Sequence, residues 1–457
     1  MIFSKTVNAL EGSIWDKIIV FAIPMALTSL FQQLFNSADI AVIGRFSGSQ
    51  ALAAVGSTAT IVNIFINCLV GTSVGATVVI SHLLGEKNEK AAQEALHASV
   101  CFSVIFGIIL GILGLLIAQP VLRLMGTPAE VLDMADLYLK IYYLGIPFLT
   151  VYNFGAAIFR ANGDTKKALF ALTVSGFINV ALNIFFVVFC GMNVDGVAIA
   201  TVIANIISAG LIIYHLTKEQ GLLHLSFCKI HWHTGLILQV LKIGIPTAIQ
   251  GMVFSLSNMI IQAAINSLGS AAIAASTVAL NFEMWAYHVL TGFSQACTAF
   301  VGLNYGARKL KRCIRITRWC MLEGIIASIF VSLFFILLRK PLVALFTADP
   351  VIAEWAYVRI CWIISFEFIS MVMDVFSGAL RGWGFSLLPA VITTAGICVL
   401  RVIYVYTVFA GWPDFGLLMA VYPLSWLVTA IGITIAYFTV KKKIIATQMG
   451  AWAEQDY

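Results

Sequence analysis

Charged residues are scarce in this sequence. Asp, Glu, Lys and Arg make up 11% of its 457 residues, whereas about 25% is usual in a soluble globular domain. Hydrophobic residues make up 61%. So few charges cannot cover the water-exposed surface of a chain this long. The composition therefore excludes an ordinary soluble protein and indicates that most of the chain lies in lipid.

Paired cysteines are also missing. The nine cysteines stand singly, without a CxxC pair, and most fall in apolar stretches. Disulfide frameworks and zinc sites need closely spaced cysteines, so we expect neither. His288 is the only histidine well inside a predicted helix of the second half, and it has no evident nucleophile or triad partner. We therefore expect no catalytic residues, no metal and no cofactor.

Long hydrophobic runs are abundant. Twelve of them are long enough for the roughly 20 residues that a helix needs to cross a bilayer, and most are joined by short loops. This pattern predicts an all-α integral membrane protein with twelve transmembrane helices. They are expected at 16–43, 52–84, 92–118, 131–159, 168–189, 195–216, 236–266, 272–304, 313–338, 351–380, 387–410 and 415–440.

Lysine and arginine are unevenly distributed along this pattern. If both termini are cytoplasmic, 20 of the 27 fall in inner segments, 4 in outer loops and 3 within helices. Such a bias is the positive-inside rule of membrane proteins. We expect a multi-pass protein of the cell inner (plasma) membrane with cytoplasmic termini. The net charge of +6 then reflects topology and requires no nucleic-acid partner. Two of the cations within helices, Lys140 and Arg359, lie near outer ends, where snorkelling would explain them.

The sequence repeats once. IPMALTSL from Ile23 matches IPTAIQGM from Ile245, and three further pairs of stretches keep almost the same register. Six helices are an even number, so the halves share one orientation and are parallel repeats about a pseudo-two-fold axis along the membrane normal. The predicted domains are a six-helix lobe at 1–216, a cytoplasmic linker at 217–235, a six-helix lobe at 236–440 and a cytoplasmic tail at 441–457.

Several stretches resemble the multidrug and toxic compound extrusion (MATE) family of antiporters. They are SADIAVIGR, GTSVGATVVISHLLG, FRANGD, GVAIAT, GFSQACTAFVGLNYGA and LRGWG. The resemblance covers nearly the full length. It implies a V-shaped pair of six-helix lobes that exports amphipathic, often cationic, compounds in exchange for protons or sodium ions. We expect alternating access, a monomer, and small amphipathic substrates and the lipid bilayer as partners.

The first hydrophobic run carries a polar stripe. Between Lys17 and Arg45 the only charged residue is Asp39, and a carboxylate inside a membrane helix faces protein or water rather than lipid. We predict that Asp39 couples transport to an ion, binding and releasing a proton as its lobe changes shape. The alternative is a structural or hydrated carboxylate. Three polar residues at helical spacing share the face of Asp39, namely Ser29, Gln32 and Asn36.

Two further predicted helices carry polar residues one turn apart. Asn179 and Asn183 lie on the fifth, and Thr201 lies on the sixth, one turn before Asn205. The resemblance implies that Asn179, Asn183 and Thr201 join Asp39 in the ion-coupling site. Some relatives have a second aspartate where this chain has Asn183, so a sodium ion would be less well compensated, and we favour protons. The alternative is packing between helices, where such hydrogen bonds contribute about 0.6 kcal/mol each.

The second half lacks the acid of the first. Shifted by the repeat, Asp39 falls on Ile260 or Ile261, so coupling through this position is expected to be asymmetric. Glu283 is a candidate for substrate binding or secondary coupling, with an ion pair to Arg401 as the alternative. The same candidate role is given to four amide side chains, Gln32, Asn36, Asn258 and Gln262.

The remaining charges inside the second half suggest structure rather than function. Glu367 and Asp374 lie seven residues apart, on one face of the tenth predicted helix, and Arg401 lies in the eleventh. A buried arginine needs a partner. We therefore predict that Glu367, Asp374 and Arg401 form structural ion pairs between these helices.

Two rival functions stay open at this point. A flippase for lipid-linked oligosaccharides or related lipids would need a strongly cationic cavity, whereas the three cations within predicted helices are scattered. An intramembrane enzyme would need a nucleophile and base on facing helices. The pattern favours a secondary active antiporter that exports organic compounds from the cytoplasm.

Overall fold

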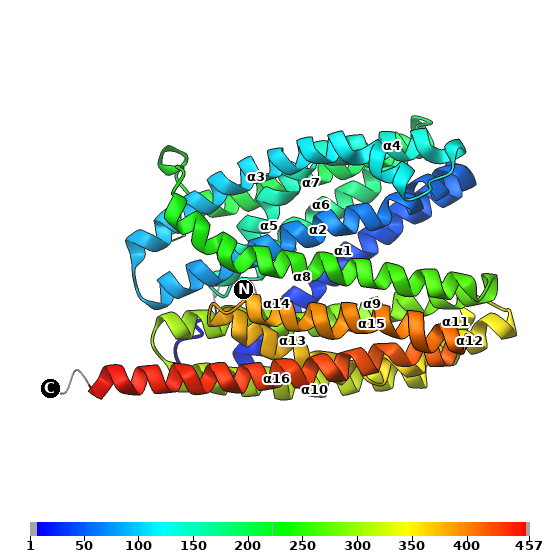
Figure 1. Cartoon of the computed structure of the whole chain (residues 1–457). Coiled ribbons are helices and arrows are strands. Elements are labelled where there is room, and N and C mark those ends of the chain that lie inside the picture. The colour runs from blue at the N-terminus through cyan, green and yellow to red at the C-terminus, as the bar shows by residue number, and fades with distance from the viewer. Residues whose placement is uncertain (1–6, 222, 454–457) are drawn as a thin grey trace. The chain divides into compact units, whose positions relative to one another are not determined.

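The computed structural model describes residues 7–221 and 223–453, and in this part of the chain helices account for nearly all regular structure, with no strand (Figure 1). A hydrocarbon environment favours helices because each satisfies its own backbone hydrogen bonds. The helices are α1 (Trp15–Phe46), α2 (Gly48–Gly85), α3 (Glu89–Leu124), α4 (Ala129–Leu144), α5 (Ile146–Ala161), α6 (Lys166–Ile184), α7 (Val194–Lys218), α8 (Thr234–Ser267), α9 (Ser270–Gly306), α10 (Leu310–Leu337), α11 (Arg339–Ala344), α12 (Pro350–Ile364), α13 (Glu367–Gly382), α14 (Leu387–Thr393), α15 (Leu400–Tyr404) and α16 (Phe415–Ala453). Three π-helical segments, η1 (Phe185–Phe189), η3 (Thr394–Val399) and η4 (Val405–Phe409), extend α6, α14 and α15, and η2 (Phe227–Lys229) is a 3₁₀ turn.

The twelve predicted spans are present. Among the described residues, ten helical segments are long and apolar enough to cross a membrane, with α12 and α13 counted as one. The helices α4 and α5, which meet at a bend of 47°, make an eleventh. The twelfth predicted span is α9, whose 37 residues are long enough to cross a bilayer. The chain is an all-α, multi-pass membrane protein.

Packing divides the chain into two compact units. Within the described residues, unit 1 contains Val7 and Leu27–Gly244, and unit 2 contains Asn8–Ala26 and everything from Ile245 onward. The borders therefore fall inside α1 and α8, close to Pro24 and Pro246. A proline within a helix removes one backbone hydrogen bond, which makes these natural places for a helix to pass from one unit to the other.

These borders differ from the predicted lobe boundaries, which lie in loops. The leading half of α1 belongs to unit 2, while the segment 217–235 and the leading half of α8 belong to unit 1. Whether the repeat itself divides at the predicted residues stays a prediction.

Glycines allow these leading halves to pack closely. In unit 1, a Cβ atom added to Gly75 of α2 would lie 2.1 Å from the carbonyl oxygen of Val240 in α8. In unit 2, a Cβ atom on Gly292 of α9 would lie 2.5 Å from the carbonyl oxygen of Ala22 in α1. Helices in membranes commonly approach through such small residues.

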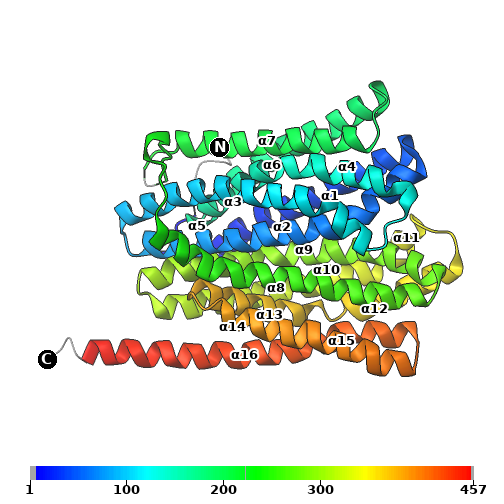
Figure 2. The same cartoon turned by 45° about the horizontal axis from the view of Figure 1, so that its top comes forward.

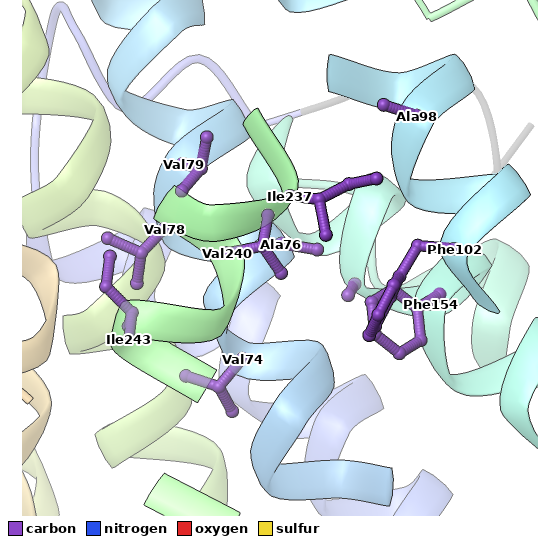
Figure 3. Packing of buried hydrophobic residues seen from close by; sticks show 11 residues of the cluster. Val74, Ala76, Val78, Val79, Ala98, Phe102, Phe154, Ile237, Val240 and Ile243 are labelled. Atoms are coloured by element: carbon purple, nitrogen blue, oxygen red, sulfur yellow. The ribbon is translucent and has the colours of Figure 1, made fainter. Parts of the chain in front are cut away.

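A hydrophobic cluster in unit 1 joins α2, α3, α5 and α8. Figures 1 and 2 show α3 alongside α5 and α6 alongside α7, pairs that are also in contact. Phe102 and Phe154 meet edge to face, with ring centroids 5.6 Å apart. Buried residues of α2, α3, α5 and α8 make one cluster (Figure 3): Val74, Ala76, Val78, Val79, Ala98, Phe102, Phe154, Ala157, Ile237, Val240 and Ile243.

Candidate functional site

Asp39 lies in unit 1, in the second half of α1, and is 8% exposed. Asn183, near the end of α6, donates a hydrogen bond from Nδ2 to Asp39 Oδ1 at 2.5 Å. Thr201 Oγ1 of α7 lies 3.4 Å from Asp39 Oδ2 and 3.0 Å from the carbonyl oxygen of Val197 on its own helix, so its one proton is shared between these two acceptors. The carboxylate thus accepts hydrogen bonds from the fifth and sixth predicted spans, as the sequence suggested.

Asn179 completes the group. Its Nδ2 donates to Thr201 Oγ1 at 3.4 Å, and its Oδ1 accepts from Asn183 Nδ2 at 3.3 Å. We call Asp39, Asn179, Asn183 and Thr201 the acid cluster. The structure brings all four predicted ion-coupling residues together, while their role in coupling stays a prediction.

The acid cluster buries a charge with neutral partners. Within the described part of the chain, Asp39 forms no ion pair. Asn183 Oδ1 is buried there without a hydrogen-bond partner. The cluster therefore presents carboxylate, amide and hydroxyl oxygens and lacks a compensating positive charge. These groups can bind a proton on the carboxylate, and the oxygen set also suits a small cation.

A glycine positions the two helices that form the cluster. A Cβ atom on Gly176 of α6 would lie 1.8 Å from the ring of Phe35 in α1, so only glycine admits this ring. Phe35 precedes Asp39 by about one helical turn, and Gly176 precedes Asn179 by three residues. The close approach therefore sets Asp39 beside the amides of α6. The helix then continues as the π-helical segment η1, a distortion that often occurs near functional sites.

The other polar residues of α1 lie outside this cluster. Gln32 is half-buried and Asn36 is exposed. On α8, Gln262 donates to Asn266 Oδ1 at 2.9 Å. Their candidate roles in substrate binding stay predictions.

Glu283 of α9 forms a buried ion pair in unit 2, but with a partner that the sequence did not suggest. Arg359 of α12 donates from Nε and Nη2 to its two carboxylate oxygens at 2.7 and 2.9 Å. The side chains are 6% and 3% exposed. The predicted snorkelling of Arg359 is therefore wrong, because a two-pronged pair with a carboxylate satisfies the guanidinium inside the protein. The alternative prediction, an ion pair between Glu283 and Arg401, is also wrong.

The predicted ion pairs of Arg401 with Glu367 and Asp374 are wrong as well. Arg401 is fully buried and donates to Asn258 Oδ1 at 2.9 Å and to Ser425 Oγ at 3.1 Å. Neither acid forms an ion pair in the described residues. The physical reason is helix packing: the guanidinium faces α8 and α16, whereas both acids lie on α13.

Comparison with known proteins decides the family. A family model described as MatE matches residues 24–185 and, a second time, residues 246–407. The chain belongs to the MatE family. The two matches start at Pro24 and Pro246, the prolines that the register of Ile23 with Ile245 aligns, which confirms the internal repeat.

Relatives of the MatE family are similar in sequence to this protein over most of its length. A probable multidrug resistance protein NorM from Thermotoga maritima is 27% identical over 84% of this chain and 83% of its own length. A probable multidrug resistance protein YoeA from Bacillus subtilis is 26% identical over 85% of each chain. A crystal structure of MATE in the straight conformation superimposes with a TM-score of 0.90 at 22% identity, over 97% of this chain and 100% of the other, which shows a shared fold. The protein is a membrane transporter of this family and not an enzyme.

One half-buried acid of this MatE protein was not singled out in the sequence analysis. Glu323 lies in α10, and both of its carboxylate oxygens are buried without a hydrogen-bond partner in the described residues. It is the only acid in the apolar run at 313–338. The reasoning that selected Asp39, a lone acid inside a predicted span, would have found Glu323 too.

Proposed function

We propose that this protein is an antiporter that exports amphipathic organic compounds, cationic ones included, from the cytoplasm in exchange for protons. Asp39 is the coupling carboxylate. The observation that carries this proposal is the acid cluster, in which a buried carboxylate is held by neutral donors from two other helices. We further propose that the protein acts as a monomer in the inner membrane, with both termini in the cytoplasm.

Proton binding at Asp39 changes the hydrogen bonds of the cluster. An ionised carboxylate only accepts hydrogen bonds, whereas a protonated one also donates. Asn183 Oδ1 has no hydrogen-bond partner among the described residues and lies on the side chain that already contacts Asp39, so it is the acceptor for the added proton after local rotation. Protonation also removes the buried charge. Both changes favour a different packing of α1 against α6 and α7 within unit 1, and this change drives release of the substrate in an alternating-access cycle.

Two considerations favour protons over sodium. The acid cluster contains a single formal negative charge, which compensates a bound sodium ion less well than two would. A proton, in contrast, needs only the carboxylate and one acceptor. A membrane potential supplies about 2.3 kcal/mol per charge per 100 mV, so import of one or two protons can drive useful export. A lipid flippase is not favoured, because the relatives named above are multidrug resistance proteins.

The test is dye export from proteoliposomes under imposed proton and sodium gradients. Wild-type protein is expected to export a cationic dye such as ethidium when a proton gradient is applied, and Asp39→Asn is expected to abolish the response. The matched control is Asp133→Asn, which removes an exposed acid of α4 and should behave as wild type. Undiminished proton-driven export by Asp39→Asn would reject the proposal. Export driven by a sodium gradient alone would reject protons as the coupling ion.

A further inference from the structure

Unit 2 buries a guanidinium among neutral partners. Arg401 is 0% exposed and donates from Nε to Ser425 and from Nη1 to Asn258. Its Nη2 is buried without a hydrogen-bond partner in the described residues. The rings of Tyr422 and Phe254 lie 4.5 and 5.5 Å from its Cζ atom. These contacts solvate the cation in part, but none of them supplies a negative charge.

The acid of this region is already engaged. Glu283 is held on both oxygens by Arg359, and the Arg359 guanidinium lies 5.7 Å from the ring of Tyr422, the same ring that Arg401 contacts. The group thus contains two guanidiniums and one carboxylate. Arg401 forms no ion pair in the described residues, and a buried ionisable group inside a membrane protein is a functional candidate.

The internal repeat shows which residues of unit 1 correspond to the position of Arg401. In the register that aligns Ile23 with Ile245, Arg401 corresponds to Asn179 of the acid cluster, and in the register that aligns Arg160 with Arg381 it corresponds to the next residue, Val180. Asp39, the charge of that cluster, corresponds to Ile260 or Ile261 in the second repeat. A buried charge therefore lies in or next to this region of each repeat, and it is negative in unit 1 and positive in unit 2.

We propose that Arg401 binds a carboxylate or phosphate group of the transported compound. This inference rests on the proposed export function and refines its substrate class to include anionic and zwitterionic molecules. The guanidinium fork matches the two oxygens of such a group. Asn258 Oδ1 marks the place of one oxygen on Nη1, and the second oxygen binds Nη2. Asn258 is partly exposed on α8 whereas Arg401 is fully buried, so the incoming group replaces this amide oxygen.

The first experiment compares export of two dyes by the full-length protein in proteoliposomes: carboxyfluorescein, which carries carboxylates, and ethidium, a cation. Loss of a charged two-pronged contact is expected to lower carboxyfluorescein export at least about tenfold in Arg401→Gln. Ethidium export should persist, which shows that this variant folds and transports. Arg401→Lys keeps the charge without the fork and should give an intermediate loss. The control Arg318→Gln, at an exposed arginine of α10, should match wild type for both dyes.

The second experiment measures binding without any gradient, from the fluorescence anisotropy of carboxyfluorescein titrated with purified protein in detergent. Wild type should bind, Arg401→Gln should bind at least about tenfold more weakly, and Asn258→Ala should bind no more weakly than wild type. Binding that depends on Arg401 without proton-driven export would reject the proposed function and support the anion site.

Three outcomes would overturn the anion site. They are equal losses of export for both dyes in Arg401→Gln, ethidium export by wild type with neither binding nor export of carboxyfluorescein, and carboxyfluorescein binding that is lost in Asn258→Ala but kept in Arg401→Gln.

Discussion

Unit 1 and unit 2 bury charges of opposite sign among neutral partners. In unit 1, Asp39 is surrounded by amides and a hydroxyl, and in unit 2, Arg401 is surrounded by an amide, a hydroxyl and aromatic rings. The neutral polar frame is thus similar in the two repeats while the charge is reversed. Under the two proposals made above, the repeated fold divides its tasks, with ion coupling assigned to unit 1 and recognition of anionic groups assigned to unit 2.

A second contrast lies within unit 2. Glu283 and Arg359 neutralise each other through two short hydrogen bonds, whereas no acid of the described residues pairs with Arg401. Breaking a buried pair strands a charge and is strongly destabilising, but removing a buried charge that has no counter-ion need not be. The paired arginine should therefore serve stability and the other arginine function.

The largest expected effect is on stability. Arg359→Met leaves Glu283 buried without its counter-ion and should cost about 3–5 kcal/mol of stability. The measurement is the thermal unfolding midpoint of purified protein in detergent. Arg401→Met is the control within the same unit and should change stability by less than about 1 kcal/mol. Similar losses of stability in both variants would contradict the distinction between the paired and the unpaired arginine. The double variant Glu283→Gln with Arg359→Met should recover most of the stability that Arg359→Met loses.

The next effect concerns the approach of α1 to α6 in unit 1. Gly176→Ala places a Cβ atom against the ring of Phe35, and such overpacking typically costs about 1–3 kcal/mol. We expect a lower unfolding midpoint together with weaker proton-driven ethidium export, because Asp39 is displaced from Asn179 and Asn183. Gly210→Ala in α7 is the control, since a Cβ atom there meets nothing within 4 Å. Equal behaviour of the two variants would contradict the positioning role of Gly176.

A smaller change tests the charge of the acid cluster. Asn183→Asp adds a second carboxylate beside Asp39, which should make sodium a better coupling ion. We expect Asn183→Asp to bind sodium about tenfold more tightly, equivalent to about 1.4 kcal/mol, and to export ethidium under a sodium gradient alone, which wild type does not. The repeat-matched control is Val405→Asp in unit 2, at the position that corresponds to Asn183 in the second repeat, and it should leave the sodium response unchanged. A sodium response that moves in the control as much as in Asn183→Asp would show that the units do not differ as proposed.

The smallest effect is expected at the longer of the two contacts to Asp39. Thr201→Val keeps the shape of the side chain but removes the hydroxyl that donates to Asp39 at 3.4 Å. A net loss of about 0.5–1 kcal/mol should follow, seen as a modest shift in the pH at which ethidium export is half-maximal. A complete loss of coupling in this variant would mean that Thr201, rather than Asp39, dominates the site.

Much of the site could be predicted from local patterns. The residues of the acid cluster lie on predicted spans at helical spacing, and a lone acid within a span has few ways to be satisfied. Glu283 and Arg401 were recognised as buried charges for the same reason. Their partners were not predictable, because Arg359 and Asn258 approach from helices far away in the chain.

The amino-acid sequence by itself determined that this chain is a helical membrane protein, how many spans it has and that it is built from two repeats, since hydropathy, helix length and self-similarity are local or periodic properties. Only the tertiary structure decided which charges are paired and where each compact unit ends. Side-chain pairing and the exchange of the leading halves of α1 and α8 depend on which helices pack together. That choice is set by close contacts such as those at Gly75, Gly176 and Gly292, which no single segment reveals.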